Sequence, residues 1–185
     1  DSGGVERDAP LFFVSPGQIN YLVPAGASVG PASVAVFRNG AAVASGAGPI
    51  TETAPGLFTA NGSGQGVPAA YALRVRGDAQ IVEPLMRYDD GQKQFVPLPI
   101  DLGPEGDLVF LILFGTGFRS ATASGVTVTV SGENAEVFYA GAASGFAGLD
   151  QANVLLPRSL AGKGEVNISF TADNRLANAV TVSVR

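Results

Sequence analysis

The chain has 185 residues, including 25 Gly and 12 Pro, and its 11 basic and 16 acidic side chains give a formal net charge of −5. The few scattered basic residues offer no continuous positive surface, which argues against nucleic acid and anionic membranes as partners. Because the sequence has no Cys and no His, it excludes Ser–His and Cys–His nucleophiles and zinc sites with imidazole ligands.

In the first part of the chain, short apolar or β-branched segments alternate with turn residues. They predict strands at residues 11–14, 19–23, 33–38, 42–44 and 50–53. Asn39-Gly40 is the strongest turn signal in the sequence and predicts a two-residue hairpin loop. Residues 61–66, Asn-Gly-Ser-Gly-Gln-Gly, have the composition of a linker, so we place a domain boundary between residues 60 and 61.

The second part of the chain continues the pattern of short strands. Nine of them are predicted, at residues 69–76, 80–88, 94–98, 108–114, 126–130, 136–139, 152–156, 166–170 and 180–184. The run 108–114 has no polar alternation and predicts a central strand covered on both faces, whereas Val126, Val128 and Val130 should share one inward face. No segment has the periodicity of an amphipathic helix, so little or no helix is expected.

One segment occurs twice. Gln18-Ile19-Asn20-Tyr21-Leu22-Val23-Pro24 returns 133 positions later as Gln151-Ala152-Asn153-Val154-Leu155-Leu156-Pro157, and a Gly-containing turn and an alternating strand follow each copy. This repetition predicts an internally duplicated architecture. The fold class that we expect is all-β, with two immunoglobulin-like β-sandwich lobes. The second lobe, residues 61–185, should be complete. The first, residues 1–60, has no counterpart of residues 108–130 upstream of residue 10, and we expect it to be incomplete alone.

Several ordered motifs carry a resemblance to a known family. They are Ser-Pro-Gly-Gln-Ile-Asn at 15–20, Ala-Pro-Gly-Leu-Phe at 54–58, Phe-Gly-Thr-Gly at 114–117, Tyr-Ala-Gly at 139–141 and Gly-Leu-Asp-Gln-Ala-Asn at 148–153. From about residue 10 to its end, the chain resembles the Solibacter-type uncharacterised C-terminal domain of large secreted acidobacterial proteins. The resemblance implies an exported, β-sandwich-like terminal module of bacterial origin. The family has no assigned catalytic residues to carry over.

The repeated segment supplies candidate ligand-binding residues. On an extended strand Gln18 and Asn20 project to one face, as do Gln151 and Asn153 on theirs. Their amides can satisfy backbone groups of neighbouring loops, which is a structural role. The alternative is sugar binding, which would need aromatic side chains beside the amides, and Tyr21 and either Tyr139 or Phe138 are the candidates.

Four aspartates are the candidate metal ligands, because calcium accepts carboxylate oxygens from turn-rich segments. They are Asp89, Asp90, Asp101 and Asp107, with Glu105 between the last two. No Asp-x-Asp-x-Asp-Gly register is present, and solvated loop carboxylates explain the same pattern. We therefore expect no cofactor, with calcium as the one alternative.

Two short motifs have a simpler structural interpretation than a functional one. Arg76-Gly77-Asp78 spells an adhesion tripeptide, but Gly-Asp also suits a tight hairpin turn. Arg119 follows Gly115-Thr116-Gly117, which suggests a phosphate loop. The Lys-Ser/Thr and the helix that such a loop requires are missing from the sequence.

Taken together, these patterns predict a non-catalytic structural or interaction module of a secreted or cell-surface protein. A carbohydrate-binding module is the alternative, and a glycosidase-like enzyme with paired carboxylates is a weaker third hypothesis. The expected partners are other domains of the same polypeptide, an extracellular partner or a glycan, without nucleic acid or membrane insertion. The longest apolar run has seven residues, far fewer than the ~20 of a spanning helix. Because the first residue is a polar Asp with no apolar signal region after it, we expect a removed export signal or an excised piece of a longer chain.

Overall fold

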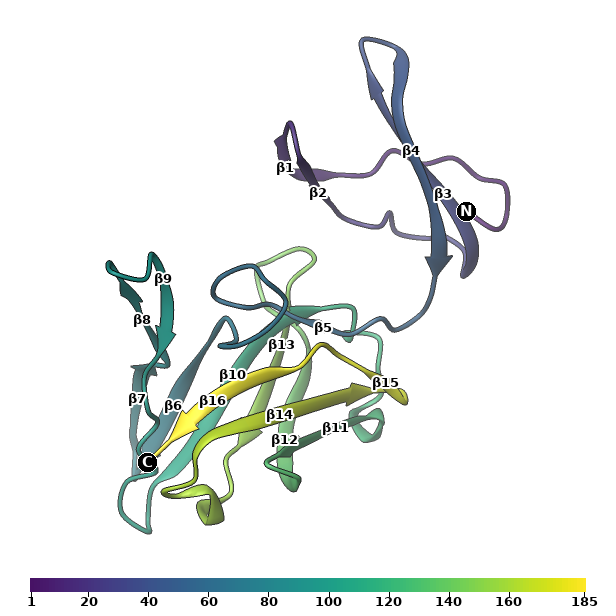
Figure 1. Cartoon of the computed structure of the whole chain (residues 1–185). Helices are drawn as coiled ribbons and strands as arrows, with labels where there is room; N and C mark the ends of the chain where they lie inside the picture. Colours follow the sequence, from purple (N-terminus) through teal and green to yellow (C-terminus); the bar gives the residue numbers. More distant parts are fainter. The chain divides into compact units, whose positions relative to one another are not determined.

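The computed structural model describes the backbone of residues 1–185 and all side chains except that of Ala123. The described chain consists of strands and loops with two 3-10 turns, η1 (Ala123–Gly125) and η2 (Arg158–Leu160) (Figure 1). The prediction of an all-β fold with little helix is therefore confirmed. The chain divides into two compact units, unit 1 (Asp1–Glu52) and unit 2 (Thr53–Arg185).

Unit 1 contains two β-hairpins. The first pairs β1 (Leu11–Ser15) with β2 (Gln18–Tyr21), and the second pairs β3 (Gly30–Arg38) with β4 (Ala41–Ile50). Asn39 and Gly40 join β3 to β4 with φ angles of 52° and 79°. Both angles are left-handed, as a two-residue turn of the primed type requires, so the predicted Asn-Gly hairpin is confirmed.

Unit 1 leaves its apolar side chains open to solvent. Among the described residues 1–52, none is buried. Phe12, Phe37 and Val43 are 59%, 67% and 58% exposed. A sandwich lobe needs two layers that bury a shared apolar face. Unit 1 therefore has the strands of a lobe without a buried core.

Unit 2 is built on one ten-stranded antiparallel sheet, accompanied by the separate hairpin of β8 (Met86–Asp89) and β9 (Gln94–Pro97). The strand order is β15-β14-β11-β12-β13-β10-β6-β7, with β16 on β14 and β5 on β10. The ten strands are β5 (Gly56–Leu57), β6 (Ala70–Arg76), β7 (Ala79–Pro84), β10 (Leu108–Thr116), β11 (Val126–Val130), β12 (Glu133–Ala142), β13 (Asp150–Leu155), β14 (Gly164–Ala172), β15 (Arg175–Leu176) and β16 (Val180–Val184).

The sheet curls because β12 belongs to both of its halves. Its first residues pair with β11 and its later residues pair with β13, and a bulge interrupts the second ladder between Val137 and Tyr139. A bulge bends its strand and increases the local twist. Strands β14 and β16 consequently lie in front of β10, β12 and β13 (Figure 1). The apolar residues on the facing sides form one core cluster.

The alternation of β11 points into that core as predicted. Val126, Val128 and Val130 are 6%, 2% and 0% exposed, whereas Thr127 is exposed. Strand β10 also lies in the middle of the sheet, between β13 and β6. Val128 packs in the same cluster as Leu111 of β10, so the two halves of the curled sheet share their core.

The segment before the predicted boundary at residues 60 and 61 is bonded to unit 2. β5 pairs with the end of β10, the amide of Ala54 donates to the carbonyl of Gly117 at 2.8 Å, and Phe58 donates to Phe114 at 2.9 Å. The Gly-rich residues 61–66 are held as well, because Asn178 Nδ2 donates to the carbonyl of Gly64 at 2.8 Å. The compact units accordingly divide earlier, between Glu52 and Thr53.

In the described part of the chain, no helix has the length and apolar character needed to cross a membrane.

Candidate functional site

The two Gln–Asn pairs have the same local geometry. Gln18 Nε2 donates a hydrogen bond of 2.7 Å to Asn20 Oδ1 on β2, and Gln151 Nε2 donates one of 2.7 Å to Asn153 Oδ1 on β13. Residues two apart on a strand share a face, so each pair closes on itself across that face. The amides thus bond to each other, whereas the sequence suggested bonds to backbone groups of neighbouring loops.

The two candidate tyrosines lie differently with respect to these pairs. Tyr139 is paired with Asn153 in the β12–β13 ladder and is 43% exposed, with its hydroxyl donating to the carbonyl of Ala142 at 2.5 Å. Tyr21 directly follows Asn20 on β2, so its side chain projects to the opposite face. The structure therefore brings Tyr139 together with the amides of unit 2 and separates Tyr21 from those of unit 1.

Further aromatic side chains surround the amide pair of unit 2, on the side of the sheet away from the core cluster, which we call the outer face. Phe114 is the β10 partner of Gln151, and its ring lies 5.9 Å from that of Tyr71 on β6. Phe110 lies further along β10, and its ring meets that of Phe138 edge-on at 5.1 Å. Phe138 is 57% exposed. The outer face thus combines two carboxamides with aromatic rings.

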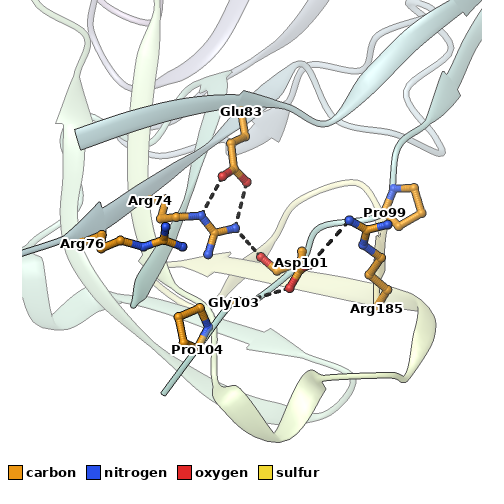
Figure 2. Close-up of a pocket in the computed structure, with 8 residues that line it drawn as sticks. All are labelled: Arg74, Arg76, Glu83, Pro99, Asp101, Gly103, Pro104 and Arg185. Atoms are coloured by element: carbon orange, nitrogen blue, oxygen red, sulfur yellow. Dashed lines mark hydrogen bonds and ion pairs between the residues drawn. The ribbon is translucent and has the colours of Figure 1, made fainter. Parts of the chain in front are cut away.

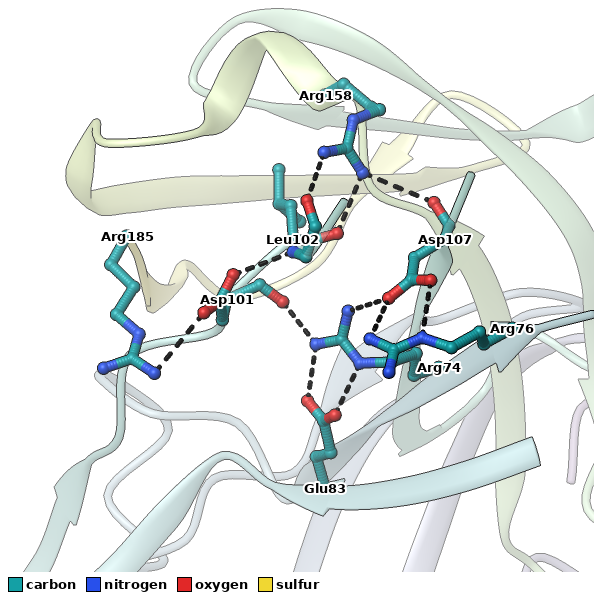
Figure 3. A network of polar contacts seen from close by, with 9 residues as sticks. Arg74, Arg76, Glu83, Asp101, Leu102, Asp107, Arg158 and Arg185 are labelled. Carbon is teal, nitrogen blue, oxygen red and sulfur yellow. Dashed lines mark hydrogen bonds and ion pairs between the residues drawn. The ribbon is translucent and has the colours of Figure 1, made fainter. Parts of the chain in front are cut away.

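At the other end of β6, Arg74 forms the centre of a polar network (Figure 3). Its Nε and Nη2 donate to the two carboxylate oxygens of Glu83 at 2.6 and 3.0 Å. Nη1 donates to Asp107 at 2.8 Å, and Nη2 also donates to the carbonyl of Asp101 at 2.5 Å. The carboxylate of Glu83, the largest contribution, raises the pKa of Arg74 above its ordinary value. Arg74 therefore stays charged and holds β7 and the loop of residues 101–107 to β6.

Asp107 is bound from two sides. Besides Arg74, Arg76 donates to its carboxylate through Nε at 2.9 Å and through Nη2 at 2.7 Å. The hydrogen bond from Arg76, with support from Arg74, lowers the pKa of Asp107 to about 2 against the opposing effect of burial. Gly103 lies so close that an added Cβ would clash with Arg74 Nη1 and with the carboxylate of Asp107. Gly103 suits this position because its φ angle is +66°, and a side chain there would force the ends of Arg74 and Asp107 to shift.

A second arginine fixes the same loop from the other half of the sheet. Arg158, in η2, donates through Nη1 to the carbonyl of Leu102 at 2.8 Å and through Nη2 to that of Gly103 at 2.5 Å (Figure 3). Arg74 and Arg158 therefore tie residues 101–107 to both halves of the curled sheet. This arrangement closes one end of the core with charge-assisted hydrogen bonds.

A pocket of about 400 Å³ lies beside the network (Figure 2). Its walls include Glu83, Asp101 and the guanidinium groups of Arg74, Arg76 and Arg185. Arg185 is the most exposed of these cations, with a 69% exposed side chain and an ion pair of 3.4 Å to Asp101. Three guanidinium groups and two carboxylates line the pocket, and the carboxylate of Asp107, bound to Arg74 and Arg76, balances the third cation. The pocket consequently resembles a closed ion-pair network more than a binding site for a charged ligand.

The four candidate metal ligands do not converge. Asp89 accepts the amides of Gly91 and Gln92 at 3.0 Å each in the β8–β9 turn, and the hydrogen bond from Gln92 lowers its pKa. Asp90 is exposed in the same turn. Asp101 accepts the amide of Gly103 at 2.8 Å, which is the largest cause of its lowered pKa.

The carboxylate of Asp107, the fourth candidate, accepts hydrogen bonds from Arg74 and Arg76. Over the described residues, no three side chains of His, Cys, Asp or Glu gather in a way that could hold a metal ion.

The turn after Gly115-Thr116-Gly117, which suggested a phosphate loop, binds the carboxylate of Asp150. The amides of Phe118 and Arg119 donate to Asp150 Oδ2 at 2.8 and 3.1 Å, and Arg119 Nε donates to Oδ1 at 2.6 Å. The Asp150 side chain is 0% exposed. Asp150 is the third residue of the motif Gly-Leu-Asp-Gln-Ala-Asn at 148–153, so this residue of the motif has a structural role.

Sequence reasoning named Tyr139 and Phe138 but missed the other outer-face aromatics, Tyr71, Phe110 and Phe114. It also missed the arginine network. Phe110 and Phe114 could have been found from the apolar run at residues 108–114. On a strand, residues at even positions of this run lie on the face opposite Leu111. For the network, the pattern of β6 places Arg74 and Arg76 on the same face as buried Ala72. The identity of their partner, Asp107, has no local signal in the sequence.

Comparisons of the chain with protein-family models, with curated proteins and with solved structures find no match.

Proposed function

We propose that the chain is a non-catalytic structural or interaction module of an exported protein. The observation that carries this proposal is that its clustered ionisable groups are bound to each other. Asp107 is held by two arginines, Asp150 by Arg119 and two amides, and Glu83 by Arg74. Groups held in this way stabilise loops and sheet edges, and they present no free acid or base to a substrate.

The protonation state of Asp107 supports the same interpretation. General acid catalysis near neutral pH needs a carboxyl group whose pKa is raised, as in the acid of a glycosidase pair. The pKa of Asp107 is lowered to about 2, so this carboxylate holds no proton to donate above pH 4. Its neighbour Glu83 is engaged by the same guanidinium group. These contacts disfavour a paired-carboxylate mechanism at the pocket.

The finer fold is part of the proposal. We infer that unit 2 is an immunoglobulin-like sandwich, in which β12 links a layer of β11, β14 and β16 to a layer of β6, β10 and β13. The antiparallel pairing and the single shared core support this inference. The bacterial origin, export and the resemblance to the Solibacter-type C-terminal domain remain predictions from the sequence motifs. Other domains of the same polypeptide are the partners that this role implies.

The test is an activity panel on the purified 185-residue chain. Glycoside, ester, peptide and phosphoester substrates should show no turnover above the buffer rate. Any activity should be challenged with Glu83→Gln and with the matched substitution Glu52→Gln in unit 1. An activity that is lost with Glu83→Gln and retained with Glu52→Gln would overturn the proposal, because it would assign chemistry to the pocket of unit 2.

Carbohydrate binding is the second candidate, and the outer face of unit 2 favours it. Gln151 and Asn153 provide amide donors and acceptors, and Tyr139 and Phe138 offer exposed rings beside them. Sugars are bound by this combination of hydrogen bonds and stacking surfaces. The calcium prediction has no comparable support, because its four aspartates do not converge.

A glycan array followed by calorimetry on plant and microbial polysaccharides would test this second function. Binding should weaken at least about tenfold with Phe138→Ala, which removes an exposed ring of the outer face. Phe146→Ala is the matched control, since Phe146 is 66% exposed in the loop between β12 and β13. Absence of binding across the panel, or equal losses with both variants, would exclude the outer face as a glycan site.

A further inference from the structure

The first hairpin of unit 1 reproduces the pairing of two strands of unit 2. In unit 2, the bulge of β12 lies next to the pair formed by Tyr139 and Asn153. In unit 1, the bulge of β1 lies next to the pair formed by Phe13 and Asn20. A bulge in the same place beside the same Asn is a specific feature of strand pairing. The hairpin β1–β2 is therefore the counterpart of β12–β13.

The second hairpin has a counterpart as well. Strand β3 ends in the left-handed turn Asn39-Gly40, after which β4 pairs back along it. Strand β14 ends in the turn Asp173-Asn174, whose φ angles of 46° and 62° are also left-handed, after which β15 and β16 pair back along it. This order makes β3 the counterpart of β14, and β4 the counterpart of β15 and β16.

β14 and its counterpart β3 differ in how many strands pair with them and in how exposed their apolar residues are. β14 is paired on both edges, because β11 runs antiparallel along the edge opposite β15 and β16. Its apolar residues Val166, Ile168 and Phe170 are 5%, 1% and 0% exposed. In the described structure β3 has only β4 as a ladder partner, and Val34 and Phe37 are 42% and 67% exposed. The edge of β3 that corresponds to the β11 edge is open.

We propose that this open edge of β3 is an interaction surface for β3 of a second copy of the chain. The two strands pair antiparallel about a twofold axis and form a four-stranded sheet in the order β4-β3-β3-β4. The second copy supplies on this edge what β11 supplies to β14 in unit 2. An unpaired, apolar strand edge is a template for this kind of association.

The sequence of β3 favours a second copy as the occupant. Ser33-Val34-Ala35-Val36 alternates small polar or Ala residues with Val, as β11 does in Val-Thr-Val-Thr-Val. β3 of one copy can therefore pair with β3 of the other copy as β11 pairs with β14 in unit 2. The charge pattern also permits it. Arg38 is the one charged residue of β3, and antiparallel pairing places the two arginines at opposite ends of the sheet.

The other edge of the hairpin is less suited to pairing. β4 carries Gly46, Gly48 and Pro49 along its second half, whereas the glycine and proline of β3 are its first two residues, Gly30 and Pro31. Glycine weakens a strand, and proline lacks the amide hydrogen that a ladder needs. The pairing between copies should therefore be confined to β3. Experiments can test this by comparing effects at β3 with effects at β4.

The association can be tested with the 185-residue chain alone by sedimentation equilibrium between about 1 and 100 μM, the affinity range of weak specific complexes. The expected result is a reversible rise from the monomer mass of 18.7 kDa to twice that value. A monomer throughout this range would overturn the proposal and leave the edge to a strand of another polypeptide.

Two matched variants locate the contact. Val34→Lys introduces a charge on β3 and should weaken the dimer at least about tenfold, because edge lysines oppose strand pairing. Val43→Lys places the same change on β4, where Val43 is 58% exposed, and should leave the dissociation constant unchanged within about twofold. Equal effects of the two variants would contradict pairing through β3.

Hydrogen exchange provides a second measurement that does not depend on a substitution. In the dimer, the amides of β3 that point away from β4 should exchange more slowly as the protein concentration rises. Those of β4 that point away from β3 should exchange at a constant rate. A dimer that protects β4 and leaves β3 unchanged would refute the proposed interface.

Discussion

Arg74 Nη1 lies 2.8 Å from Asp107 Oδ2, and the two side chains are 5% and 2% exposed. This buried ion pair joins the end of β6 to the residue that precedes β10. The carboxylate of Glu83 lies on the other side of the same guanidinium group. A charge removed from water has to be compensated by its neighbours, so each member of this network depends on the others.

Arg74→Met should destabilise unit 2 by about 3 kcal/mol, because it leaves Asp107 and Glu83 without their shared cation. Urea denaturation monitored by circular dichroism would measure the loss. Arg185→Met is the matched control, since the Arg185 side chain is 69% exposed, and its effect should stay within about 0.5 kcal/mol. Equal stabilities of the two variants would mean that Arg74 contributes no more than a surface cation.

The stability of the chain should fall in acid as Asp107 is protonated. The pKa of Asp107 is lowered from 3.8 to about 2, mainly by the hydrogen bond from Arg76. Between these values the unfolded state binds more protons than the folded state, so stability increases with pH. The contribution of Asp107 is therefore complete above pH 4 and is lost as the pH falls through 2.

Asp107→Asn tests this assignment. The variant should be less stable than the wild-type chain at pH 7, and the difference should shrink between pH 4 and pH 2 in urea titrations at fixed ionic strength. Asp90→Asn, at an exposed position of the β8–β9 turn, should leave the acid limb of the stability curve unchanged. An acid limb of the Asp107→Asn variant that is as steep as that of the wild-type chain would contradict the role of Asp107.

Val128→Asp should unfold unit 2. Val128 is 2% exposed and faces the core, so the substitution buries a carboxylate without a partner and costs more than about 4 kcal/mol. Thr127→Asp is the control on the exposed face of the same strand. Near-ultraviolet circular dichroism and thermal melting would separate the two variants. Wild-type-like melting of Val128→Asp would place the core on the other face of β11.

The alternating and turn-forming parts of the fold could be predicted from the sequence, because their signals are local. The inward face of β11 follows from the period of two in Val126, Val128 and Val130, and the β3–β4 hairpin follows from Asn39-Gly40. The Gln–Asn pairs could likewise be placed on one face from their spacing. Their bonding to each other could not, because an amide two residues away competes with many backbone groups.

Other features depend on distant residues and have no local signal. The predicted boundary followed the linker-like composition of residues 61–66, but Asn178 holds Gly64 and β5 pairs with β10. Gly62, Gly64 and Gly66 have left-handed φ angles of 64°, 75° and 80°. In the sequence, glycines that a folded loop needs for such angles look the same as the glycines of a flexible linker. The pairing of Arg74 with Asp107 spans 33 positions, and it depends on how the loop before β10 closes the core.

Gly117→Ala should detach the segment around Ala54 from the end of β10. Gly117 has a φ angle of +79°, and a Cβ at this position would clash with the carbonyl oxygen of Ala54. The substitution therefore adds a backbone clash to the usual cost of about 1–2 kcal/mol for a left-handed residue with a side chain. Hydrogen exchange should show faster exchange at the amides of Ala54 and Phe58, whose acceptors are Gly117 and Phe114.

Gly132→Ala is the control for this last prediction. Gly132 has nearly the same φ angle, +80°, and apart from its chain neighbours no heavy atom lies within 4 Å of the position that a Cβ would take. The variant therefore isolates the cost of the backbone angle, and its amide exchange near Ala54 should match that of the wild-type chain. If both variants lose the same stability and neither speeds exchange at Ala54, the close contact of Gly117 with Ala54 does not hold this segment on unit 2.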